Sequence, residues 1–219
     1  MPLNPFTLLL LLLSVVFLVV LVQVGAITIA FDKLGLSPGT GMLLLFGSLI
    51  GSGINIPLFE RESRGDAPRP PADVPLPWGI PRLPWTGRTV IAVNVGGCLI
   101  PVGVSLYLLG NQPLSLTGTA LALAIVTFVS YRFSRPIPGI GIGMPLLLAP
   151  LTAVLAALLL DPAHSAPVAY ISGTLGVLIG ADILHLREMD TVGAPLASIG
   201  GAGTFDGIFF TGIIAALLA

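Results

Sequence analysis

Two aspartates stand inside apolar stretches of this 219-residue sequence, and they are its strongest candidates for chemistry. Asp182 lies in the segment Gly-Ala-Asp-Ile-Leu-His at 180–185, and Asp206 lies in Gly-Thr-Phe-Asp-Gly at 203–207. A carboxylate at membrane depth costs about 2.5–3.5 kcal/mol on insertion scales, and it is retained where it faces the bundle interior, a partner or water. Such residues are functional candidates by default.

The positions of the two aspartates in the chain indicate that they can meet. If the connection from Arg187 to about Gly201 forms a turn, Asp182 and Asp206 lie at similar depth on neighbouring antiparallel helices. Two facing carboxyls in a low dielectric cannot both ionise, so the pair would share a proton. Such a pair can activate water and protonate a leaving group, or it can exchange protons or a cation during transport. A structural role, with each aspartate bonded to hydroxyl or backbone groups, stays open as well.

The composition puts these aspartates in a membrane protein. Hydrophobic residues make up 55% of the chain and charged residues only 9%, against about 25% charged in a soluble domain. Both a soluble globule and a disordered chain are therefore excluded. The net charge of −1 gives no support for a nucleic-acid partner, and the single Cys98 excludes a disulfide framework and a cysteine-based metal cluster. We expect the lipid bilayer as a partner and neither a metal nor a cofactor; the oligomeric state is not predicted.

Seven apolar segments are long enough to cross a bilayer as helices, since a span needs about 20 residues. The predicted fold class is therefore an all-α, polytopic bundle of about seven transmembrane spans that forms a single domain over residues 1–219. The expected spans lie at 6–31, 39–59, 89–110, 114–131, 141–160, 167–186 and within 194–219.

The basic residues give this bundle an orientation, because cytoplasmic loops carry the excess of Lys and Arg. With the seven spans above, eight arginines fall on the side of the N-terminus and Lys33 alone falls on the other side. The N-terminus is thus predicted to be cytoplasmic and the C-terminus outside. The longest cytoplasmic loop, 60–88, is rich in proline and is expected to be extended. It is either a solvated linker or an arm through which a non-catalytic membrane scaffold recruits a partner.

Polar and small residues near the aspartates complete the candidate site. Asn55 and Asn94 lie near the cytoplasmic ends of spans two and three, in the depth zone of the aspartates. They could bond the aspartate pair or a substrate backbone, or they could form an interhelical hydrogen bond of about 0.6 kcal/mol. Gly203 and Gly207 flank Asp206 and allow helices to approach closely, with room for water or an extended peptide. His185 is one turn from Asp182 and is either part of a metal or proton relay or an interfacial side chain, which is the more usual case.

The segment 203–211 resembles the GxGD segment of the presenilin and signal peptide peptidase family. Gly203 matches the first glycine, Asp206 matches the catalytic aspartate, and Ile208 to Thr211 match the run that follows, while Phe205 replaces the second glycine. Asp182 matches the family's other aspartate in order and in helix position. The resemblance implies an intramembrane aspartyl protease in which Asp182 and Asp206 are catalytic and a transmembrane peptide is the substrate.

The same resemblance implies a Pro-Ala-Leu element, which in that family follows the second aspartate and for which this sequence offers two displaced counterparts before Asp206. Pro145, followed by two leucines, is one counterpart, and Pro195, followed by Leu and Ala, is another. The whole chain also resembles an uncharacterised family of prokaryotic polytopic membrane proteins through the segments at 94–97, 180–182 and 203–207. This second resemblance implies an integral protein of the prokaryotic plasma membrane. A proton- or cation-coupled transporter that uses the same aspartates is the alternative to a protease.

Overall fold

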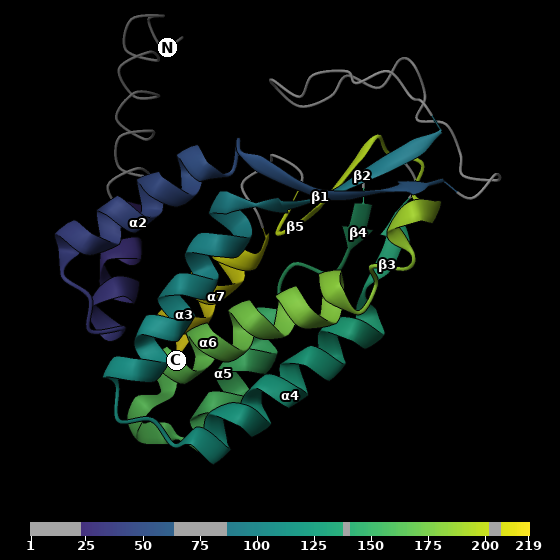
Figure 1. Cartoon of the computed structure of the whole chain (residues 1–219). Helices are drawn as coiled ribbons and strands as arrows, with labels where there is room; N and C mark the ends of the chain where they lie inside the picture. The colour runs from purple at the N-terminus through teal and green to yellow at the C-terminus, as the bar shows by residue number, and fades with distance from the viewer. Residues whose placement is uncertain (1–22, 64–86, 138–140, 202–206) are drawn as a thin grey trace, which may run out of the picture.

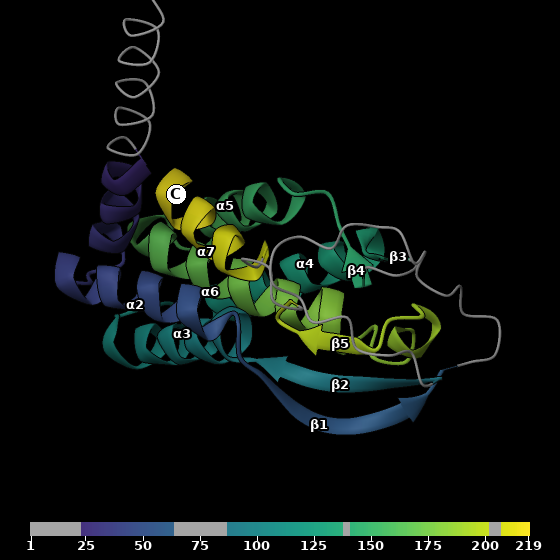
Figure 2. The same cartoon turned by 90° about the horizontal axis from the view of Figure 1, so that it is seen from above.

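The computed structural model describes residues 23–63, 87–137, 141–201 and 207–219. Helices gather around a central helix, α6, and a three-stranded sheet lies at one end of them (Figure 1). A view turned by 90° shows β1 as the strand that lies farthest from the helices (Figure 2). The molecule therefore has a helical part and a sheet end, and both contribute residues to the site described below.

The described helices range from short 3-10 turns to the 18 residues of α4. Two of them adjoin π-helical segments: η1 directly precedes α3, and η3 directly follows α6. A helix at Gln23–Lys33 precedes α2 and is bent from it by 113°. The bounds are α2 Pro38–Gly51, η1 Val95–Leu99, α3 Ile100–Asn111, α4 Leu116–Phe133, α5 Leu148–Leu160, η2 Pro162–His164, α6 Ser165–Val177, η3 Leu178–Ile183, η4 Met189–Thr191 and α7 Gly207–Leu218.

The central position of α6 follows from its small and apolar side chains. Nearly every residue of α6 is buried, as expected of a helix that is apolar on all sides. It packs against α3, α4, α5 and α7. At Gly173, an added Cβ atom would lie 3.3 Å from the Cβ atom of Ala153 and 3.6 Å from that of Ala215. Small residues thus let α6 approach two neighbouring helices at once.

The larger sheet has the order β1–β2–β5, with bounds Asn55–Glu62, Arg88–Asn94 and Leu196–Ile199. β2 pairs antiparallel with β1 and parallel with β5. A second sheet is the hairpin of β3, Arg135–Ile137, and β4, Gly141–Gly143. Residue types explain the strands, because Thr89 to Val93 is rich in β-branched side chains. Pro57 is tolerated because β1 is an edge strand.

The prediction of an all-α bundle of seven transmembrane spans is wrong. Among the described residues, the helices long and apolar enough to cross a membrane are Leu116–Phe133 and Pro162–Ile183, with the bent pair Gln23–Lys33 and Pro38–Gly51 as a third if it counts as one span. The predicted spans at 39–59 and 89–110 each combine a helix with a strand. Short apolar runs fit a strand as well as a helix, and hydropathy alone does not separate the two. The two or three helices that are long and apolar enough to cross a bilayer are compatible with a membrane protein.

Hydrogen bonds define the end of the molecule opposite the sheet, which we call the far end. The hydroxyl of Ser165, at the start of α6, donates to the carbonyl oxygen of Ala219 over 3.0 Å, so α6 and α7 run antiparallel. Lys33 Nζ donates to the carbonyl oxygen of Leu217 over 2.9 Å. Among the arginines used above to predict the orientation, those that the structure describes lie on or beside the sheet elements. Lys33 lies at the far end.

Candidate functional site

Asp182 lies at the sheet end of the central helix, in the π-helical segment η3. Its side chain is half-buried, and Oδ2 accepts a hydrogen bond from the backbone N–H of Gly200 over 2.7 Å. Gly200 directly follows β5, so the bond joins the end of the central helix to the end of the sheet's inner edge strand. π-Helical segments are often found at functional sites. The carboxylate is thus oriented by a peptide N–H outside regular structure.

Only glycine fits at position 200. Its φ is +87°, a left-handed conformation that side chains rarely adopt. A Cβ atom there would also lie 2.7 Å from both the Cβ atom and the backbone nitrogen of Cys98. The turn at Gly200 is therefore fixed between Asp182 on one side and η1 on the other.

Asn55 and Asn94 meet as paired residues of β1 and β2. Asn94 Nδ2 donates to Asn55 Oδ1 over 3.0 Å and to the carbonyl oxygen of Ser52 over 2.7 Å. Asn94 Oδ1 accepts from the backbone N–H of Gly97 over 2.8 Å, which caps η1. The hydroxyl of Ser198 on β5 donates to Asn55 Oδ1 over 2.7 Å. This network, Ser52, Asn55, Asn94, Gly97 and Ser198, links all three strands to the start of η1.

Burial makes the network expensive to disturb. Asn94 is only 1% exposed, and its amide nitrogen and its oxygen are both engaged within the chain. Removing the side chain would leave buried backbone groups without their partners, a loss that costs more than the hydrogen bond itself contributes. The two asparagines were predicted on helices; the structure places both on strands, because the β-branched run before Asn94 pairs with β1.

The backbones of α2 and η1 come into contact beside this network. The Ser48 hydroxyl donates to the carbonyl oxygen of Gly96. A Cβ atom at Gly96 would overlap backbone atoms of Ser48, Gly51 and Ser52. Glycine is thus required at position 96 by the close approach of another helix, and that approach holds η1 against α2.

The second predicted aspartate, Asp206, lies outside the described residues, as does Gly203. Gly207 is the first residue of α7. Because α6 and α7 run antiparallel, Asp182 at the carboxyl end of the central helix and Gly207 at the amino end of α7 lie at the same end of the pair. α7 therefore begins at the same end of the helical part at which Asp182 lies.

Residues 49–218 match a family model described as "Protein of unknown function (DUF1614)". The chain belongs to the DUF1614 family. No curated protein and no solved structure matches the sequence significantly. The matched range contains every candidate site residue of the sequence analysis, so the site lies within this DUF1614 domain.

Two further predicted residues of the DUF1614 domain lie apart from the polar network. Pro145 is exposed on the turn between β4 and α5, and β4 in turn adjoins η3. His185 is buried; its Nδ1 lies 3.0 Å from the carbonyl oxygen of Gly180, and its ring centre lies 4.9 Å from that of Tyr131. These contacts explain why the side chain of His185 is buried at the end of the central helix.

Sequence reasoning missed Ser198 and Gly200, which hold the network and Asp182. Both lie in the connection from Arg187 to about Gly201, which was predicted only as a turn before the last span. The alternation of half-buried and buried side chains along Leu196 to Ile199 is typical of a strand, but four residues are too few for periodicity to reveal it. Across the described ranges, no group of three His, Cys, Asp or Glu side chains is placed to hold a metal ion.

Proposed function

We propose that this protein is an integral protein of the prokaryotic plasma membrane and an aspartate-dependent hydrolase of peptide bonds, with Asp182 and Asp206 as its catalytic pair. One observation carries the proposal. The Asp182 carboxylate lies at the end of the helix pair where α7 begins, and Asp206 directly precedes that beginning in the sequence. The resemblance of 203–211 to the GxGD segment adds support from the sequence.

The chemistry assigned to the pair is general acid–base catalysis. One carboxylate removes a proton from water, whose oxygen forms a bond to the carbonyl carbon of the scissile peptide. The other carboxyl group gives its proton to the amide nitrogen, the carbon–nitrogen bond breaks, and an amine and a carboxylic acid leave. The hydrogen bond from the Gly200 N–H to Asp182 Oδ2 fixes the orientation of one carboxylate of the proposed pair.

A proton- or cation-coupled transporter is the second candidate. The observation that favours it is the pair Gln23–Lys33 and Pro38–Gly51, which is bent by 113° at a break of a few residues. Discontinuous helices of this kind often form the substrate and ion sites of transporters. The two candidates use the same aspartates and differ in whether a covalent bond is broken.

The test compares Asp182→Asn and Asp206→Asn with Asp161→Asn, an aspartate at the far end. Each protein is reconstituted in liposomes with a mixture of single-span peptides, and cleavage is followed by mass spectrometry. We expect the first two variants to lose roughly 100-fold or more of the activity, the scale of a general acid or base, and Asp161→Asn to keep it. Circular dichroism of each variant verifies the fold.

Three results would overturn the proposal that the protein is a protease. Cleavage that persists in both catalytic variants would remove the aspartates from the chemistry. Wild-type protein that cleaves nothing but carries protons across the liposome membrane, with transport lost in Asp182→Asn, would establish the transporter. Aspartate variants that are silent in cells, with loss of function when 66–84 is deleted, would establish the scaffold.

A further inference from the structure

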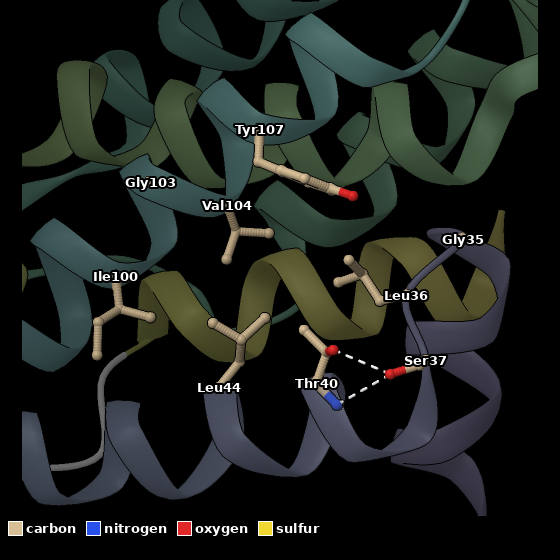
Figure 3. A pocket seen from close by; sticks show the side chains of 9 residues that line it. All are labelled: Gly35, Leu36, Ser37, Thr40, Leu44, Ile100, Gly103, Val104 and Tyr107. Atoms are coloured by element: carbon tan, nitrogen blue, oxygen red, sulfur yellow. Dashed lines mark hydrogen bonds between the residues drawn. The ribbon is translucent and has the colours of Figure 1, made fainter.

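A groove of about 670 Å³ lies between α2 and α3, away from the aspartates (Figure 3). One wall is formed by Ser37, Thr40 and Leu44, spaced as one stripe on the start of α2. The facing wall is formed by Ile100, Gly103, Val104 and Tyr107, again one stripe along α3. The bend at Gly35 and Leu36 closes one end. The size falls within the range of about 300–1,000 Å³ that is usual for small-molecule sites.

The groove is polar at one end and apolar along the rest. The Ser37 and Thr40 hydroxyls lie 2.9 Å apart at the bend, and the hydroxyl of Tyr107 points toward the side where Gly35 and Leu36 lie (Figure 3). Leu44, Val104 and Ile100 line the remainder. The polar end is also the end nearest Lys33 and the termini of α3 and α7, so hydroxyl groups gather where the helices stop.

Both helices that form the groove also carry exposed apolar side chains. On α2, Leu43 and Ile50 are each 72% exposed and Phe46 is 56% exposed; on α3, Leu106 is 62% exposed. Large apolar side chains at this exposure on two adjacent helices mark an interaction surface or contact with lipid. In a chain with helices suited to a membrane, the acyl region of the bilayer covers such a surface.

We propose that this groove binds one acyl chain of a membrane phospholipid, with the ester group of the lipid at the hydroxyls of Ser37, Thr40 and Tyr107. The apolar walls match the chain. The Ser37 and Thr40 hydroxyls bond to each other, which leaves one of their two O–H groups, together with that of Tyr107, to donate to ester carbonyl oxygens. Tyrosine is enriched at this level of the bilayer. A transmembrane helix fits less well, because a helix with its side chains is about 10–12 Å wide and the groove would hold about two turns of it or fewer.

This inference rests on the proposed membrane location and is independent of the catalytic pair. Its failure would leave the hydrolase intact, since the groove residues and the aspartates belong to different elements. Conversely, Asp182→Asn is expected to leave lipid binding unchanged and is included to separate the two proposals.

Two glycines of α3 provide a matched test. An added Cβ atom meets nothing within 4 Å at either Gly103 or Gly110, and both positions are exposed on the same helix, but only Gly103 lines the groove. Gly103→Leu fills the groove, Gly110→Leu does not, and Gly103→Val serves as a smaller second variant. The proteins are reconstituted in phosphatidylcholine with a diazirine on one acyl chain, irradiated, digested and mapped by mass spectrometry.

We expect wild-type protein, Gly110→Leu and Asp182→Asn to carry lipid adducts on α2 and α3 residues of the groove. Gly103→Leu is expected to lose these adducts about ten-fold, because the added side chain occupies the space of the acyl chain, with a smaller loss in Gly103→Val. Melting temperatures verify that the glycine variants fold. Equal labelling of Gly103→Leu and Gly110→Leu would overturn the proposal. The proposal would also be overturned if a photoreactive single-span peptide labelled the groove and the lipid did not.

Discussion

The two ends of the molecule use polar side chains in different ways. At the far end, charged side chains serve helix termini: Lys33 donates to a carbonyl of the last turn of α7, and Asp161 Oδ2 accepts from the Ser115 N–H at the start of α4 over 2.9 Å. At the sheet end, Asn94 bonds to backbone groups of Ser52 and Gly97 and to the side chain of Asn55 on the neighbouring strand. Asp182 accepts from the backbone N–H of Gly200 in the turn after β5. The contacts named at the far end follow the usual rules of helix capping. Those at the sheet end include one cap, Asn94 on η1, and go beyond capping to join a turn and a neighbouring strand.

This difference separates stability from candidate function. A capping side chain satisfies backbone groups that every helix leaves open, so its loss is expected to lower stability alone. At the sheet end, Asp182 lies against the glycine turn at Gly200. Helix capping does not require this contact. Irregular backbone at such a site persists only where the surrounding structure holds it. We therefore expect substitutions at the sheet end to have the larger effects.

The largest effect on stability is expected at Gly96. Gly96→Ala puts a Cβ atom into the backbone of α2 and should cost about 3 kcal/mol or more, the upper part of the range for overpacked sites. Gly110→Ala, toward the far end of α3 in open space, should be neutral or stabilising by up to about 1 kcal/mol. Denaturant titration of the purified proteins in detergent measures both. Equal stability of the two variants would contradict the close contact of η1 with α2.

The next effect is expected at Asn94. Asn94→Ala leaves the buried carbonyl oxygen of Ser52 and the N–H of Gly97 without their partner and should cost about 2–3 kcal/mol. Asn111→Ala is the matched control, because that exposed side chain only donates to the carbonyl oxygen of Tyr107 one turn earlier. It should change the free energy of unfolding by about 0.5 kcal/mol or less. If both variants cost the same, the network does not hold the sheet end.

A smaller, pH-dependent effect is expected at Asp161, which is 8% exposed. The hydrogen bond from the Ser115 backbone holds the pKa of this carboxyl below its usual value, against the opposing effect of burial and with help from His164. A lowered pKa stabilises the folded protein above the unfolded value of about 3.9, and this stabilisation is lost as the pH falls through the folded value.

Asp161→Asn keeps an acceptor for the Ser115 N–H and removes the charge. It should cost about 1–2 kcal/mol at pH 7, the scale of a helix cap, and the difference from wild type should vanish in acid, below the pKa of the folded protein. Unfolding measured at pH 7 and at successive steps below pH 4.5 tests this. A difference that is constant across the range would exclude the charge as its source.

The smallest effect is expected at Lys33, which is exposed. Lys33→Met removes the donor to the carbonyl of Leu217 and the positive charge at the end of α7, at a cost of about 0.3–1 kcal/mol. The loss should shrink at high salt because exposed charges are screened. Lys33→Arg keeps the charge and should restore most of the stability. A loss that does not depend on salt would point to packing of the lysine stem instead.

Part of this architecture was predictable from residue types alone. The apolar stretches near 116–133 and 162–183 were recognised because their length and hydropathy suffice for a helix without help from neighbours. Asn55, Asn94 and Asp182 stood out because polar side chains are rare in such a chain. Strands 55–62, 88–94 and 196–199 were missed, since a strand is completed by partners that lie far away in the sequence.

The sequence by itself determined that the chain is strongly apolar, that its charges are few, and that Asp182 and Asp206 stand inside apolar stretches. These properties belong to single residues and to their order, so no fold is needed to read them. The tertiary structure decided that Asn55, Asn94 and Ser198 share one network and that Gly200 binds Asp182. Such contacts depend on the register of strands and on the approach of backbones at glycine, and both are settled only when distant segments pack together.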